Sequence, residues 1–335
     1  MNDLSHLKGA SALVTGANGF IGSHLVDQLL ACGCKVHGLV RRSSDLKWLD
    51  PSRIQLHKVD LAQPDFKIPA LEEIDFIFHC AGLTKAKSRT DFFQVNASAC
   101  SNLYEQCEKR AGNIKAIVHL SSLAATGPSP KGGRVDETTP CNPVTFYGQS
   151  KLAGEEIALR FSDSLPVTVL RPPVVYGPRE ENFFTFIKLI GKGWGLQIGK
   201  AGKELSLIYV ADLVQAMLIA SHPSKQEGGR YFVTDGQVHA WEQVAKECAD
   251  IMNVQINTLK IPEGILNPVA LFFEFWASFS SKPALFDRQR MIDIQQSSWS
   301  ASPKKFFEVL RFEPQYDLSQ GLAKTVQWYQ QQKWL

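Results

Sequence analysis

Short apolar runs alternate with amphipathic stretches through the first half of this chain, and that alternation restricts the fold more than any other feature of the sequence. The apolar runs predict strands over 12–15, 35–40, 54–59, 75–79, 116–121 and 168–171. Helical patterns between them cover 20–31, 92–109 and 146–162. Because such runs are apolar on both faces, the helices must cover both sides of one sheet. The pattern therefore predicts a doubly wound, parallel α/β sheet.

The regular alternation ends near Arg171. Gly- and Pro-rich loops follow, and the later helices and isolated strands show no second clean alternation. We therefore expect residues 1–171 to form the sheet domain. Residues 172–335 are expected to form a smaller, mostly helical lobe that binds substrate, with returns to the sheet near 204–235.

Charge and cysteine content exclude several classes of protein. The net charge of +3 is too small for a nucleic-acid-binding surface. The 7 cysteines lack the spacing of a zinc site or of a secreted disulfide framework, so we expect reduced thiols and no metal. The N-terminus shows no signal or transit pattern, which predicts a cytoplasmic location.

The stretch 264–279 is the most apolar part of the sequence. It is shorter than the ~20 residues that a membrane-spanning helix needs, and it contains Pro268 and Glu274. Two interpretations remain: a lobe helix that closes over the substrate, or a helix that makes weak peripheral contact with a membrane. The absence of a Lys- and Arg-rich face favours the first.

A glycine-rich turn joins the first predicted strand to the first predicted helix, with the sequence GANGFIG over 16–22. In such a turn Gly16 allows the tight bend, Gly19 lets the backbone approach a pyrophosphate, and Gly22 lets the helix pack on the strand. The helix N-terminus then faces the phosphates. This motif predicts a Rossmann-type dinucleotide site, whose expected contacts are Gly16, Asn18, Gly19, Phe20, Ile21 and Gly22.

The second predicted strand ends in Arg41 and Arg42, where an acidic residue would hold the ribose hydroxyls of NAD. Guanidinium groups suit a phosphate dianion, so NADP is favoured over NAD. The alternative is that these arginines stack on the adenine or face solvent.

Two further segments at strand ends are expected to line the cofactor. Asp60 and Leu61 follow the third strand, where the carboxylate can accept a hydrogen bond from the adenine amino group or simply cap the next turn. Ala81 and Gly82 follow the fourth strand and offer a surface of small residues.

Tyr147 and Lys151 lie four residues apart, on one face of the helix predicted from 146. A neighbouring ammonium stabilises a phenolate, which would lower the pKa of Tyr147 toward working pH and suit it to proton transfer. Ser122 follows the fifth strand, at the sheet edge where such folds bind ligands. Its hydroxyl can hold a substrate oxygen against Tyr147.

In these segments the chain resembles the extended short-chain dehydrogenase/reductases, also called the NAD-dependent epimerase/dehydratase family. The likeness covers essentially the whole sequence. The matching segments are GANGFIG, VDL, HCAG, VNASACSNLYEQC, HLSSLAATG, YGQSK, LRPPVVYGPR, LIYVADL and GLAKTVQWY.

The resemblance implies a role for several residues. Ser122, Tyr147 and Lys151 would form the catalytic set. Tyr147 and Lys151 would also contact the cofactor, with Lys151 holding the nicotinamide ribose. Asn96 would order the loop beside the cofactor, and 172–174 would contact the nicotinamide end, through Pro172 and Val174. The expected substrate contacts are Thr84, Ser122, Val174 and Tyr176.

Two departures from the family pattern concern the substrate. Members that act on nucleotide-diphosphate sugars usually carry Asn where this chain has Val174, and Arg where it has Leu205. The chain therefore looks more similar to the 3β-hydroxysteroid dehydrogenase and dihydroflavonol reductase branches. This favours an NAD(P)-dependent oxidoreductase for a less polar carbonyl or alcohol. A nucleotide-sugar epimerase or dehydratase is the alternative, followed by a non-catalytic dinucleotide sensor, and the resemblance allows a homodimer.

Overall fold

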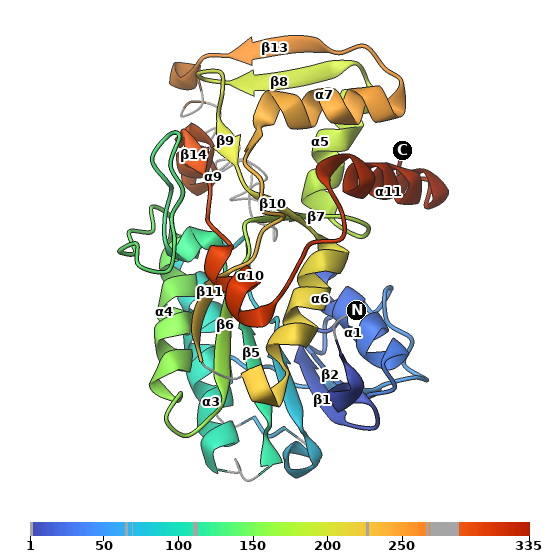
Figure 1. Cartoon of the computed structure of the whole chain (residues 1–335), viewed down its shortest axis with the longest axis vertical. Coiled ribbons are helices and arrows are strands. Elements are labelled where there is room, and N and C mark those ends of the chain that lie inside the picture. Colours follow the sequence, from blue (N-terminus) through green and yellow to red (C-terminus); the bar gives the residue numbers. More distant parts are fainter. Residues whose placement is uncertain are drawn as a thin grey trace.

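The computed structural model describes residues 3–63, 66–68, 70–109, 113–225, 228–265, 268 and 288–335. Its main sheet contains the strands β1 Ser11–Thr15, β2 Lys35–Val40, β3 Gln55–Lys58, β4 Phe76–His79, β5 Ala116–Leu120, β6 Val167–Arg171 and β11 Gly229–Phe232. The order is β11-β6-β5-β4-β1-β2-β3, and every neighbouring pair is parallel (Figure 1). This confirms the predicted sheet, and each of the first six strands ends within one residue of its predicted limits.

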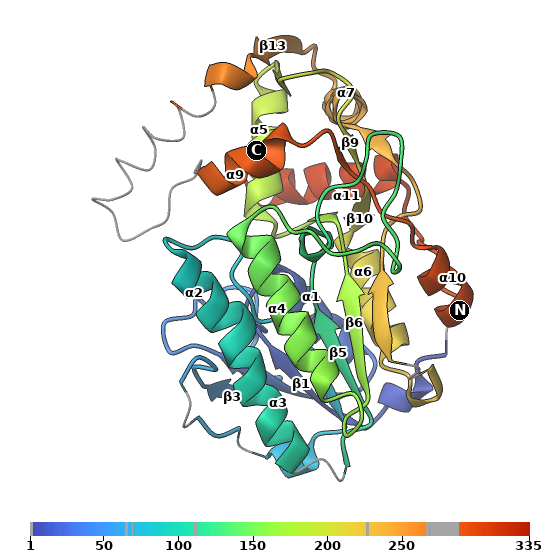
Figure 2. The same cartoon turned by 90° about the vertical axis from the view of Figure 1, so that its left-hand side faces the viewer.

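Helices cover both faces of this sheet. The helices α1 Phe20–Ala31 and α6 Val210–Ala220 pack together on one face. On the other face lie α3 Ala99–Lys109 and α4 Phe146–Arg160, in front of the strands in Figure 2. Side chains alternate between the two layers, so Val14 and Phe78 join one core while Leu13 and Ile77 join the other.

The predicted helix over 92–109 is divided in the structure. It consists of α2 Arg89–Phe93, a π-helical turn at Gln94–Ser98, and α3. Shorter 3-10 turns lie at Ser5–Leu7, Leu71–Glu73, Leu123–Ala125 and Pro223–Lys225.

The rest of the chain forms a lobe above the carboxyl ends of the strands (Figure 1). Its helices are α5 Glu181–Gly191, α7 Trp241–Met252, α9 Arg288–Gln295 and α11 Leu318–Gln331, whereas α10 Lys304–Leu310 packs against the edge strand β11 of the main sheet. Small sheets, which the sequence pattern did not predict, connect them: β7 Val174–Tyr176 with β10 Leu207–Tyr209, β8 Trp194–Ile198 with β13 Asn257–Ile261, and β9 Glu204–Leu205 between β12 His239–Ala240 and β14 Ser298–Trp299. The division at 171/172 stays a prediction.

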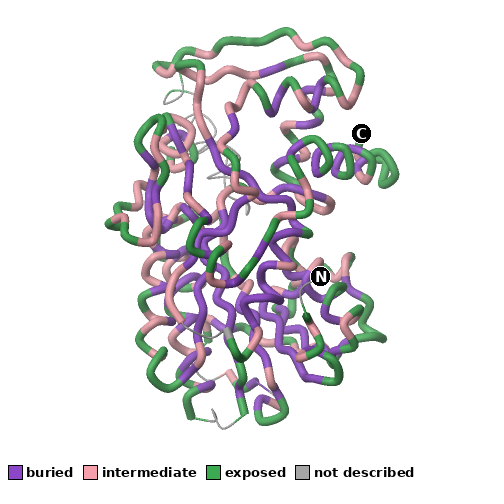
Figure 3. The backbone as a smooth tube through the Cα atoms, viewed as in Figure 1, coloured by how far each residue is buried: buried purple, intermediate pink, exposed green. Residues whose placement is uncertain are grey.

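Buried residues are concentrated in the sheet and beneath the lobe, whereas the outermost strand β13 is largely exposed (Figure 3). Most of the apolar stretch 264–279 lies outside the described residues, so both interpretations of it stay open. Within the described ranges, no helix has the length and apolar character needed to cross a bilayer.

Candidate active site

The glycine turn lies where β1 passes into α1, and two of its glycines have no room for a side chain. Gly16 has φ +64°, and a Cβ there would lie 2.9 Å from the Cα of Ala81. A Cβ on Gly22 would overlap the carbonyl oxygen of Gly16. The backbone of this turn therefore packs closely against α1 and the end of β4. A ligand can approach the turn from its opposite, outer side.

The start of α1 fits the phosphates of a dinucleotide. Gly19 is the N-cap residue, and among the described residues no side chain caps this helix end. The N–H groups of the first turn and the positive end of the helix dipole therefore favour an anion here. The free N–H groups at this helix end and the closely packed glycine turn therefore fit the predicted dinucleotide. Phe20 and Ile21 are the first residues of the helix.

Arg41 and Arg42 follow β2 and are both exposed. The loop that carries them is tied to the glycine turn, because Asn18 Nδ2 donates to the carbonyl oxygen of Asp45 at 3.1 Å. Ser44 Oγ accepts the N–H of Arg41 at 3.1 Å and tightens the bend. Both guanidinium groups thus lie on a loop held next to the phosphate-binding turn.

Asp60 is exposed, and its Oδ1 accepts the N–H of Ala62 at 3.1 Å. Asp60 therefore caps the turn after β3, which is the simpler of its two predicted roles. Asp60 Oδ2 takes no part in that hydrogen bond and can accept one from a ligand. The carbonyl oxygen of the buried Leu61 accepts a hydrogen bond from Asn102 Nδ2 at 3.1 Å.

Asn96 joins the loop after β4 to the rest of the site from its π-helical turn. Its Oδ1 accepts the N–H of Leu83 at 2.7 Å, and its Nδ2 donates to the Leu83 carbonyl at 3.0 Å and to Ser150 Oγ at 2.9 Å. Gly82 lies against this amide, since a Cβ on Gly82 would come 3.2 Å from Asn96 Oδ1 and 3.6 Å from Lys151 Nζ. Asn96 thereby fixes the loop of small residues beside the Lys151 ammonium.

The structure brings Ser122 and Tyr147 together. The α4 helix begins after Thr145, whose Oγ1 accepts the N–H of Gly148 at 3.2 Å. A Cβ on Gly148 would overlap the carbonyl oxygen of Ala124, so only glycine lets α4 approach the turn after β5 this closely. Across that contact the hydroxyl of Ser122, which accepts the N–H of Ala124 at 3.2 Å, is close enough to the phenol of Tyr147 to lower its pKa.

Lys151 lies one helical turn beyond Tyr147 and is buried. Its Nζ donates to the carbonyl oxygen of Leu120 at 2.7 Å, at the end of the strand that leads to Ser122. Burial lowers the pKa of Lys151, and Cys100, Glu155 and Cys80 act in the opposite direction.

The pKa of Tyr147 differs from the sequence-based expectation. Burial raises it, and the Ser122 hydroxyl only partly opposes that effect. From α9, Asp293 raises the pKa of Tyr147 further and Arg290 lowers it. The expected net lowering of this pKa is therefore wrong for this arrangement, because removal of the phenol from water outweighs the lowering by Ser122 and Arg290.

The expected substrate contacts do not all lie together. Val174 is 42% exposed at the start of β7, and Thr84 is exposed in the loop after β4. Pro172 is buried, and its carbonyl accepts the N–H of Leu123 at 2.8 Å. Tyr176 is only 1% exposed, because its ring packs between the lobe and the sheet. We therefore remove Tyr176 from the substrate-binding set.

The packing around Tyr176 explains its burial. Its ring centroid lies 5.4 Å from that of Phe183 and 5.7 Å from that of Tyr209. The phenol oxygen rests on Gly321 of α11, where a Cβ would overlap it.

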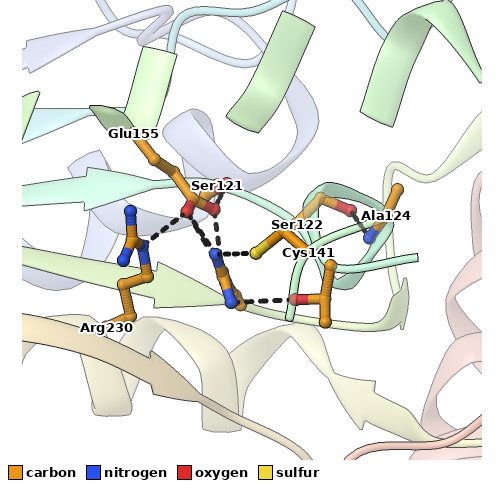
Figure 4. A network of polar contacts seen from close by, with 8 residues as sticks. Ser121, Ser122, Ala124, Cys141, Glu155 and Arg230 are labelled. Carbon is orange, nitrogen blue, oxygen red and sulfur yellow. Dashed lines mark hydrogen bonds and ion pairs between the residues drawn. The ribbon is translucent and has the colours of Figure 1, made fainter. Parts of the chain in front are cut away.

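A buried ionic cluster beneath the site was missed by the sequence analysis. Glu155 of α4 binds Arg171 of β6, and Arg230 and Ser121 complete the group around the same carboxylate (Figure 4). The available signal was the position of Glu155, four residues after Lys151 and therefore on the same helix face.

One group of described side chains is compact enough to suggest a metal ion. Potential ligand atoms of His79, Cys100 and His119 lie within 4.8 Å of one another. However, His79 Nδ1 is hydrogen-bonded to Thr15 Oγ1 at 2.8 Å and its Nε2 to Cys100 Sγ at 3.2 Å. Burial raises the pKa of Cys100 to about 12, and the ammonium of Lys151 is close enough to affect all three groups. The arrangement is that of a hydrogen-bonded core.

Comparison with known proteins agrees with these features. The model of the NAD dependent epimerase/dehydratase family matches residues 12–233. A ceramide reductase of Caulobacter vibrioides is 27% identical, over 96% of this chain and 95% of that protein. The decarboxylating sterol-4-alpha-carboxylate 3-dehydrogenase of Bos taurus is 29% identical, over 67% of this chain and 65% of that protein.

Among solved structures, a UDP-glucose 4-epimerase from Thermotoga maritima, crystallised with UDP-glucose, shares the fold. It superposes with a TM-score of 0.77 at 22% identity and covers 96% of this chain and 99% of that one. Since the family match extends from β1 to just beyond β11, the resemblance in the motifs is confirmed. The chain belongs to the NAD-dependent epimerase/dehydratase family, the extended short-chain dehydrogenase/reductases.

Proposed function

We propose that this protein transfers a hydride between a nicotinamide dinucleotide and a carbonyl or secondary alcohol of a relatively apolar small molecule. The observation that carries the proposal is the close contact of α4 with the turn after β5, which brings the Ser122 hydroxyl near the phenol of Tyr147, with Lys151 one helical turn away. A hydroxyl and a phenol that lie this close together can both reach one substrate oxygen.

Each of these side chains has a separate task. When bound, the dinucleotide supplies the site that gives or accepts the hydride. Tyr147 gives a proton to the substrate oxygen in the reductive direction and removes it in the oxidative direction. Ser122 donates a hydrogen bond to that oxygen and fixes its position. Lys151, whose Nζ donates to the Leu120 carbonyl, would hold the ribose of a bound dinucleotide and would add a positive charge to the site.

Two apolar residues support the proposed substrate class. Val174, two residues after Pro172, has an exposed aliphatic side chain where sugar-nucleotide enzymes usually carry Asn, and the buried Leu205 cannot provide a charge for a diphosphate. The names of two relatives, a ceramide reductase and a sterol-4-alpha-carboxylate 3-dehydrogenase, refer to lipid substrates.

The proposal is tested by following NADPH oxidation with a panel of steroid ketones, aryl ketones and long-chain 3-oxo compounds, with UDP-glucose in parallel. We expect oxidation of NADPH with at least one apolar ketone and no reaction with UDP-glucose. Conversion of UDP-glucose to its 4-epimer without net change of cofactor would replace the proposal by the epimerase alternative. Dinucleotide binding without turnover of any compound would instead indicate a sensor.

For the cofactor, we propose that Arg41 and Arg42 hold the 2′-phosphate of NADP. The double variant Arg41→Ser/Arg42→Ser is expected to weaken NADPH binding by about 10–100-fold, since charge-assisted bonds to phosphate contribute roughly 1.5–3 kcal/mol. NADH binding should change less than about 2-fold. Fluorescence titration with each cofactor measures both, and Arg53→Ser, another exposed arginine, is the control. An equal loss for NADPH and NADH would contradict the assignment and indicate stacking on adenine.

Three further expectations stay predictions: the cytoplasmic location, the homodimer, and weak membrane contact through 264–279. Imaging of a tagged chain, sedimentation and vesicle flotation would test them in turn.

A further inference from the structure

Glu155 lies on the same face of α4 as Lys151 and Tyr147, one and two helical turns further along. Its side chain is 0% exposed, beneath the ends of β5 and β6. A buried carboxylate needs partners on all its lone pairs, because an unpaired buried charge is strongly destabilising.

The partners of Glu155 come from β6, from β11 and from the residue that follows β5 (Figure 4). Arg171 Nε donates to Oε1 at 2.9 Å and Arg171 Nη2 donates to Oε2 at 2.6 Å. Arg230 Nε donates to Oε2 at 3.1 Å, and Ser121 Oγ donates to Oε1. A single carboxylate thus binds the end of β5, the end of β6 and β11.

These contacts hold Ser122 from both sides along the chain. Ser121 directly precedes it. Beyond it, Arg171 Nη1 donates to Thr126 Oγ1 at 2.8 Å, and the carbonyl of Pro172 accepts the N–H of Leu123 at 2.8 Å. Glu155 and Tyr147 belong to the same helix, α4. Through these contacts Glu155 therefore connects α4 to the turn that carries Ser122.

We propose that Glu155 is a positioning residue for the reaction: through its hydrogen bond with Ser121 it holds the Ser122 hydroxyl where this hydroxyl and the Tyr147 phenol can act on the same substrate oxygen. This inference rests on the proposed function of Ser122 and Tyr147. Displacements of about 1 Å in a reacting site reduce rates by roughly 100-fold, so a rigid connection between the two elements has a measurable effect.

Ser121→Ala is the informative variant, because it removes the connection from Glu155 to β5 and leaves the ion pair with Arg171 in place. We expect kcat to fall about 10-fold, which is less than the roughly 100-fold loss expected if Ser122 moved by a full ångström. The KM for the dinucleotide should change less than about 2-fold, since the glycine turn is untouched.

The pH profile separates positioning from a general loss of stability. The Ser122 hydroxyl lowers the pKa of Tyr147, so a displaced Ser122 lets that pKa rise. The other groups that act on the phenol, Asp293 and Arg290 of α9, are unchanged by the variant. In the oxidative direction, where the phenolate is required, the rise of kcat/KM should therefore move to higher pH.

A spectroscopic measurement gives the same information without a substrate. Phenolate absorbance is titrated in the parent protein and in Ser121→Ala, each minus its Tyr147→Phe counterpart, so that only Tyr147 contributes. The matched control is Ser164→Ala, which also removes a serine-to-glutamate hydrogen bond, from Ser164 Oγ to Glu108 Oε1 at 2.7 Å, but in an exposed position.

The outcomes distinguish the positioning role of Glu155 from the proposed function of Tyr147. A shifted Tyr147 titration and a reduced kcat in Ser121→Ala, with Ser164→Ala unchanged, support the inference. If Ser121→Ala keeps the parent titration and kcat while Tyr147→Phe is inactive, the positioning role of Glu155 is overturned and the proposed function stands. Full turnover by Tyr147→Phe would overturn the proposed function instead.

Discussion

Tyr147→Phe is expected to lower kcat by about 10²–10⁴-fold, the usual contribution of a positioned proton donor. The change removes one oxygen and keeps the ring, whose centroid lies 6.2 Å from that of Phe92. Because burial raises the pKa of Tyr147, the phenol holds its proton at neutral pH and is ready to donate it to a carbonyl oxygen. Single-turnover oxidation of bound NADPH, with the ketone identified in the panel, measures the chemical step directly.

Cofactor affinity serves as the internal check on this variant. Tyr147→Phe leaves the glycine turn and α1 unchanged, so the Kd for NADPH should change far less than kcat. Tyr316→Phe makes the same chemical change in the lobe, where the ring lies 4.8 Å from that of Tyr209, and should keep full activity. Undiminished single-turnover rates in Tyr147→Phe would show that another group transfers the proton.

The sheet was predictable because its signal is local. Each strand is a short apolar run, and strands covered on both faces need no knowledge of their neighbours to be recognised. The π-helical turn at Gln94–Ser98 was not predictable in this way. Its position is associated with Asn96, whose amide satisfies the backbone of Leu83 and so depends on a contact between separate elements.

The same contrast between local spacing and contacts across separate elements explains which features of the site could be predicted from the sequence. Tyr147 and Lys151 are recognised by a spacing within one helix, and the structure places them as that spacing implies. Tyr176 belongs to an equally suggestive segment, but Gly321, far away in the sequence, leaves room for its ring in the core. The pKa of Tyr147 also depends on burial, which spacing alone does not reveal.

Glu155 and Arg171 show the same limit for charged residues. Arg171 ends an apolar strand, where a charge is usually taken as the exposed boundary, yet it is 1% exposed. Burial alone would lower the pKa of Arg171, but the hydrogen bonds and charge of Glu155 raise it overall. The pair is stable only because both partners are present, a property that neither residue shows in its own sequence context.

Arg171→Leu is therefore expected to reduce the free energy of unfolding by about 3–5 kcal/mol, the usual cost of removing one partner of a buried ion pair, because the contacts of Glu155 with the partly exposed Arg230 and with Ser121 do not replace a bidentate, buried guanidinium. The variant also loses the hydrogen bond to Thr126 and the contact with the ring of Phe232, whose centroid lies 5.5 Å from the guanidinium carbon. Urea unfolding measures the change. Lys304→Met, which breaks the exposed pair of Lys304 with Glu308, should leave the unfolding midpoint unchanged.

The double variant Glu155→Leu/Arg171→Leu decides whether the loss comes from the stranded carboxylate. Removing both charges leaves Arg230, whose side chain is 33% exposed and can turn toward water, and the hydroxyl of Ser121, which can find another acceptor at lower cost than a charge. The double variant should therefore be more stable than Arg171→Leu, although it lacks one more native side chain. The single variant Glu155→Leu completes the comparison. If the losses of unfolding free energy in Glu155→Leu and Arg171→Leu simply add in the double variant, the carboxylate and guanidinium are not coupled, and packing rather than charge holds β6 to α4.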